Sequence, residues 1–151
     1  PAELVEVFKT VTLAFLEGPT PRSVTVTSHG DLMSIGTLVY RLRTLRVFAE
    51  WMRHHHLASL HEVTDQQLDR YRQHVLRLEA STHHKSHLLI AVRTVWEYRD
   101  RLPSHCRLNT HNPWGGTPPV RLAAASSRPA AAENTTPRIA ADPGLKPSQN
   151  R

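Results

Sequence analysis

Eleven histidines and a single cysteine are the side chains of this sequence best suited to bind a metal ion. Three histidines are consecutive at 54–56, and two more are adjacent at 83–84. Neighbouring helical residues point about 100° apart and cannot share one tetrahedral ion, and zinc sites need wider spacing with further partners, commonly cysteine. Cys106 stands alone. We therefore expect no metal site and no cofactor.

Two carboxylates, Asp65 and Asp69, are four residues apart and are the candidates for acid–base chemistry. At the start of a helix they have a simpler explanation, because acidic side chains in the first turn stabilise the helix dipole. The sequence has no glycine-rich phosphate loop, no Gly-x-Ser-x-Gly elbow and no paired cysteine and histidine nucleophile. We expect no small-molecule substrate.

Basic and hydroxyl side chains recur at helical spacing in two strips. A solvated charged face is the commonest explanation of such a strip, so its meaning depends on the rest of the chain. The first strip consists of Arg43, Arg46 and Arg53, and the second of Thr82, Lys85, Ser86 and Arg93.

The element that must position the first strip is the stretch 36–56, which we expect to be the central helix. Its apolar residues recur at i+3 and i+4 on two opposite faces. A helix that is apolar on both sides is packed on both sides, so this one should lie inside a helical cluster. One face holds Leu38, Leu42, Leu45, Ala49 and Met52, and the other holds Tyr40, Val47 and Trp51.

Apolar stripes at the same spacing predict three further helices. Each has a start or stop signal, namely a Gly-Pro pair, a capping box or a proline. The first covers 2–17 and ends before Gly18-Pro19. The second begins at Thr64, with Gln67 at the capping-box position. The third runs from Ser81 or Thr82 to about Leu102 and ends before Pro103. We expect 33–102 to be at least half helical without a sheet of three or more strands, and Trp51 and Trp96 to be largely buried.

Composition divides the chain into three parts. Residues 1–33 hold the first helix and an extended arm, in which the strand-like SVTVTS at 23–28 has no evident partner. Residues 34–116 form the helical domain. Residues 117–151 contain six prolines and eight alanines in 35 positions and hardly any large apolar side chain, so they should be a linker or a disordered tail.

The net charge of +6 comes mainly from the helical domain, where 12 Lys and Arg face 7 Asp and Glu. This balance favours a polyanionic partner, nucleic acid first and an anionic membrane second. One cysteine excludes an internal disulfide, which suits a reducing cytoplasm. No apolar run of about 18 residues and no leader is visible, so we expect no contact with a membrane. The start at Pro1 suggests a processed chain or a piece of a longer one.

Five segments, in this order, resemble a known family: TLVYRLRTLRVFAEW (37–51), LHEVTDQQLDRYRQHV (60–75), STHHKSHLLIAVRTVWEYR (81–99), NPWGG (112–116) and TPRIA (136–140). Together they resemble the N-terminal core-binding (SAM-like) domain of the tyrosine recombinases, or phage integrases. The resemblance rests on the order of the helices more than on any single motif. It implies an all-α fold, a small orthogonal helical bundle with an extended N-terminal arm and a disordered C-terminal tail.

The resemblance also implies a function, which is duplex DNA binding as one half of a C-shaped clamp on a recombination site. Expected partners are double-stranded DNA and, on that DNA, other recombinase protomers. The strip that includes Thr82 and Lys85 would meet phosphates at a helix N-terminus, where backbone N–H groups favour an anion. Arg43 and its neighbours on the central helix would add phosphate contacts. An arginine can also read a base edge, so the sequence leaves that choice open.

The other half of the clamp is a catalytic domain with an Arg, Lys, His-x-x-Arg, His/Trp and Tyr set, which this chain lacks. Arg46, His74-x-x-Arg77 and Tyr98 imitate part of that set in the right order, but they fall on the helices of the binding domain. We interpret Arg77 as surface charge and Tyr98 as a packing residue. The chain should therefore be no enzyme alone, and we expect it to be a truncated or frameshifted integrase or an excised fragment.

Two alternatives remain. The chain could be a helical protein-interaction module whose basic face meets an acidic partner, with no role on DNA. A weaker alternative is an unrelated helix-turn-helix regulator.

Overall fold

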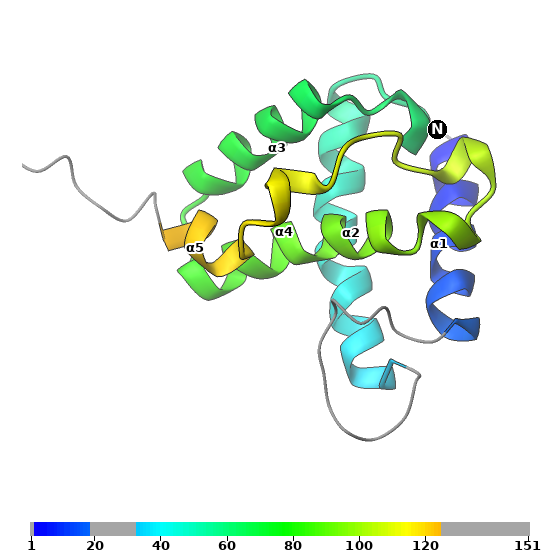
Figure 1. Cartoon of the computed structure of the whole chain (residues 1–151), viewed down its shortest axis with the longest axis horizontal. Coiled ribbons are helices and arrows are strands. Elements are labelled where there is room, and N and C mark those ends of the chain that lie inside the picture. Colours follow the sequence, from blue (N-terminus) through cyan, green and yellow to red (C-terminus); the bar gives the residue numbers. More distant parts are fainter. Residues whose placement is uncertain (1, 19–32, 125–151) are drawn as a thin grey trace, which may run out of the picture.

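The computed structural model of the chain describes residues 2–18 and 33–124 (Figure 1). Five α-helices account for most of these residues, and the described part contains no strand. The predicted all-α fold is confirmed, as is the predominance of helix over 33–102. The expected arm at 19–32 and the tail at 125–151 lie outside the described residues. The helices are α1 (Ala2–Glu17), α2 (Ile35–His54), α3 (Asp65–Arg77), α4 (Thr82–Glu97) and α5 (Pro119–Ala124).

Helix α2 is packed on more than one side, as its two apolar faces predicted, because it contacts α1, α4 and, through Phe48 and Trp51, α3. In Figure 1, α1 and α2 run side by side in opposite directions, and α4 passes across α2. The remaining two helices, α3 and α5, pack on α4. The helix that carries the second strip is therefore enclosed on several sides, which limits what its polar residues can reach.

One hydrophobic core joins all four long helices, and it includes Val11 and Phe15 of α1. An aromatic cluster lies at its centre, where the ring of Phe48 meets that of Tyr71 at 4.7 Å between centroids. Trp51 is buried beside them, as predicted. Full burial of one such side chain is worth roughly 1.5–3 kcal/mol, so this cluster fixes the packing of α2 against α3.

Trp96 is partly buried and packs against the core, so it is less enclosed than Trp51. Its indole N–H donates a hydrogen bond to the carbonyl oxygen of Thr110 at 2.9 Å. The guanidinium of Arg99 lies 3.8 Å from the centre of its ring. The residue therefore seals the edge of the core beneath a loop.

The helix starts follow the capping signals in the sequence. At α3 the Thr64 hydroxyl accepts from the Gln67 backbone N–H at 3.3 Å, while the Gln67 side chain accepts from the Thr64 N–H at 2.7 Å. This is the predicted capping box. Ser81 caps α4 in a similar way by accepting from the N–H of His84 at 3.2 Å.

The end of α4 differs from the prediction, because the α-helix stops at Glu97 and a 3₁₀ turn at Arg99–Arg101 follows. Leu102 is already extended, with ψ at 145°. A residue before proline is disfavoured in the helical region, which accounts for the extended conformation of Leu102.

The helical domain also extends past its predicted boundary at residue 116. Helix α5 packs on α4 and buries Ala123 completely. A composition rich in alanine and proline indicated an unstructured segment. Alanines can nonetheless dock a short helix, because their small side chains let two backbones approach closely.

A left-handed turn connects the loop to α5 at Pro113–Gly116. Trp114, Gly115 and Gly116 all have positive φ, at 60°, 59° and 77°. Two glycines suit such a turn because they have no Cβ to clash in that region, whereas Trp114 must be held there by its surroundings.

Candidate nucleic-acid interface

Most side chains of the second predicted strip make contacts within the molecule. Ser86 is only 2% exposed, and its hydroxyl donates to the carbonyl oxygen of His83 at 2.7 Å. The Lys85 ammonium donates to the carbonyl oxygen of Leu76 at 2.8 Å, so it caps the end of α3. Thr82 is partly buried in the first turn of α4.

Arg93, the remaining member, has an intramolecular role. Its Nη2 group donates to the carbonyl oxygens of Pro113 at 2.9 Å and Thr117 at 2.7 Å, one on each side of the left-handed turn. Burial lowers the pKa of this guanidinium, and the charge of Glu97 opposes that shift. Arg93 thus fastens the turn to α4, and its contact with DNA stays a prediction.

The first strip does lie at the surface, since Arg43, Arg46 and Arg53 are all exposed on α2. Arg46 forms an ion pair with Glu50, with 3.0 Å between Nε and Oε1. The strip is nevertheless divided. Arg46 and Arg53 line a groove between α1 and α2, whereas Arg43 is absent from that lining.

Arg43 is exposed on α2 outside that groove. Tyr40 lies one turn before it on α2, and residues three apart on a helix are neighbours. The ring of Tyr40 contacts that of His87 on α4, with 4.9 Å between centroids, and His87 contacts His83 at 4.3 Å. We use the name α2–α4 corner for Tyr40, His83 and His87 together with Arg43, which lies one turn further along α2.

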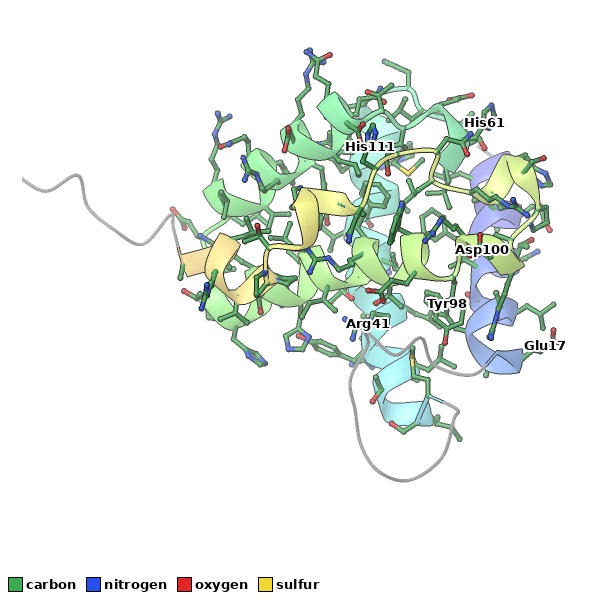
Figure 2. All side chains as sticks on the ribbon, in the orientation of Figure 1. Glu17, Arg41, His61, Tyr98, Asp100 and His111 are labelled. Carbon is green, nitrogen blue, oxygen red and sulfur yellow. The ribbon has the colours of Figure 1, made fainter. Side chains whose placement is uncertain are left out.

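Cationic groups near the corner act on His87. Burial lowers the pKa of His87, and the neighbouring His83, Arg41 and His84 lower it further. Arg41 lies behind the corner, only 6% exposed, where Figure 2 labels it beside the crossing of the two helices. Burial lowers the pKa of Arg41, and the charge of Glu97 opposes that shift.

Three corner residues, Tyr40, His83 and His87, were not among the predicted site residues. The i, i+4 spacing of His83 and His87 is visible in the sequence and places both on one side of a helix. Their meeting with Tyr40 depends on where α4 crosses α2, which no spacing within one helix reveals.

The chemistry of the corner is that of anion recognition. An exposed guanidinium and imidazoles can donate to phosphate oxygens, and an aromatic ring offers an apolar contact. The described residues contain no group of three metal-binding side chains.

Tyr98 takes the place of the nucleophilic tyrosine in the sequence pattern that imitates the catalytic set. It is 1% exposed, and its ring packs 4.7 Å from that of Phe15. Its interpretation as a packing residue is confirmed.

Comparison of the chain with protein-family models, with curated proteins and with solved structures gave no match. In the described part of the chain no helix is both long enough and apolar enough to cross a membrane.

Proposed function

We propose that this protein binds duplex DNA through the α2–α4 corner, as the core-binding half of a site-specific tyrosine recombinase. The proposal rests on the exposed Arg43 one turn after Tyr40 on α2, on the ring contacts of Tyr40 with His87 and of His87 with His83, and on the buried guanidinium of Arg41 near His87. The order of the helix segments and of the NPWGG turn supports the recombinase part of it.

Contacts of this kind would position the duplex without reading its sequence, because phosphate contacts fix register and base-edge contacts provide specificity. Arg53, and Arg46 where Glu50 does not neutralise it, would add long-range attraction that salt screens. In this proposal, cleavage of the strand belongs to a catalytic domain outside this sequence.

A titration against duplex DNA at several salt concentrations tests the proposal, with wild type compared to Arg43→Ala. Each phosphate contact contributes about 0.9 to the slope of log K against log salt, so the variant should bind all duplexes more weakly and lose about 1 from that slope. Arg77→Ala is the matched control, since it removes the same charge from an exposed position on α3.

Equal losses of DNA affinity in Arg43→Ala and Arg77→Ala would show that the protein attracts DNA only through its general positive charge. A curve for Arg43→Ala that overlays that of wild type at every salt concentration would remove the corner from consideration as a DNA-binding surface.

A further inference from the structure

A groove between α1 and α2 has no role in the proposed DNA contact. Its volume is about 660 Å³, which is within the roughly 300–1,000 Å³ of typical ligand sites. The floor and walls are apolar and include Leu4, Phe8, Leu42 and Leu45. Val5, on the rim, leaves 56% of its surface exposed.

The shape of the groove suits a helix. It extends from Leu4 to Thr12 along α1 and from Leu42 to Arg53 along α2, which is two to three turns on each side. Two helices packed side by side leave a furrow between them in which the ridge of a third helix can lie. An amphipathic helix binds such a furrow by inserting apolar residues at i, i+3 or i+4, and i+7.

The charges at the rim indicate which helix would fit. Lys9, Arg46 and Arg53 line the groove together with one acidic residue, Glu50. Glu50 pairs with Arg46, and Lys9 pairs with Glu6 at 2.7 Å. Arg53 makes no ion pair with any residue in the described ranges. The rim therefore keeps a cationic excess that complements acidic side chains.

We propose that this groove binds an acidic amphipathic helix of a partner protein, with the apolar face of that helix between α1 and α2 and its carboxylates against Arg53 and Lys9. The recess favours a helix over a flat anionic bilayer, because a planar surface would span the rim and leave the volume of about 660 Å³ unfilled. The proposal does not depend on the DNA contact at Arg43, which lies outside the groove; Arg46 and Arg53 enter the DNA proposal only through long-range attraction.

The probe for a test is a stapled synthetic helix of about four turns, with leucines along one face and glutamates elsewhere; stapling removes the ordering cost that short helices have. Its comparator carries lysines in place of the glutamates. Fluorescence anisotropy with the whole chain should give micromolar binding of the glutamate peptide and at least tenfold weaker binding of the lysine peptide.

Charge reversal then locates the site. Arg53→Glu should weaken binding of the glutamate peptide roughly three- to tenfold and strengthen binding of the lysine peptide. Val5→Glu should weaken binding of the glutamate peptide, because it places a charge on the apolar rim. The matched control is Arg70→Glu, which reverses an exposed charge on α3 and should change neither affinity. Circular dichroism checks that these surface variants remain folded.

Four results would overturn the proposal: no binding of the glutamate peptide; equal binding of both peptides; an effect of Arg70→Glu as large as that of Arg53→Glu; or dimerisation of the free chain that Val5→Glu abolishes, since the occupant would then be a second copy.

Discussion

His111 and Asp65, 46 positions apart in the chain, form the most complete polar contact between a loop and a helix start. The His111 imidazole meets the Asp65 carboxylate with 2.7 Å between Nδ1 and Oδ2, and the His111 backbone N–H donates to Oδ1 at 3.0 Å. The side-chain hydrogen bond raises the pKa of His111 and lowers the pKa of Asp65. The pair thus ties the loop before the left-handed turn to the first turn of α3.

The stabilising effect of this pair should depend on pH. The contribution of His111 is fully present below its unfolded pKa near 6.5 and is lost as pH rises through its raised folded value. The contribution of Asp65 is present above 3.8 and is lost as pH falls through its lowered folded value. His111→Ala removes the imidazole but keeps the backbone hydrogen bond to Asp65. The variant should therefore be less stable than wild type at about pH 5.5, where the imidazole is charged, and the difference should be much smaller at about pH 8.5.

NMR titration of the His111 imidazole checks the cause directly. The pKa should lie above 6.5 in wild type and return toward that value in Asp65→Asn. The same titration midpoint in both proteins would mean that the contact does not persist in solution.

At the scale of elements, Arg93 joins α4 to the turn that leads into α5. Because its two hydrogen bonds come from a charged, partly buried donor, Arg93→Ala should lower the free energy of unfolding by roughly 1–3 kcal/mol. Urea denaturation measures the loss, and Arg77→Ala at the exposed end of α3 should cost no more than about 0.5 kcal/mol. Equal stability of Arg93→Ala and Arg77→Ala would show that the two hydrogen bonds of Arg93 contribute nothing to the free energy of unfolding.

At the scale of the whole molecule, one core includes α1 at one side and reaches α5 at the other, so these helices should unfold together with α2 and α4. Ala123→Leu would overfill the contact between α5 and α4 and should cost about 1–3 kcal/mol in the common transition. Ala124→Leu, one residue later at an exposed position, is the control and should be close to neutral. A neutral Ala123→Leu would mean that α5 is not docked.

α2 serves both proposed surfaces, which lie on different sides of it. Arg46 and Arg53 line the groove with α1, whereas Arg43 is exposed outside it, one turn after Tyr40. Because each surface has an arginine of its own, the DNA titration and the peptide titration can succeed or fail separately.

The sequence alone determined the four long helices and the packing of α2 on more than one side. Apolar spacing predicted these helices, the Thr64 and Gln67 pair predicted the capping box of α3, and the two apolar faces of α2 predicted that it packs on both sides. These features are local or periodic, so a single stretch of chain contains the information that specifies them.

Only the tertiary structure decided which polar residues remain at the surface. Spacing put Ser86 and Arg93 on one side of a helix, but the crossing of α4 with its neighbours buried the first and used the second as a clamp. The same packing brought Tyr40 to His87 and docked α5 beyond the expected boundary. Helical periodicity gives the direction of each side chain relative to its own axis, whereas exposure depends on how separate axes cross, and distant segments set that geometry together.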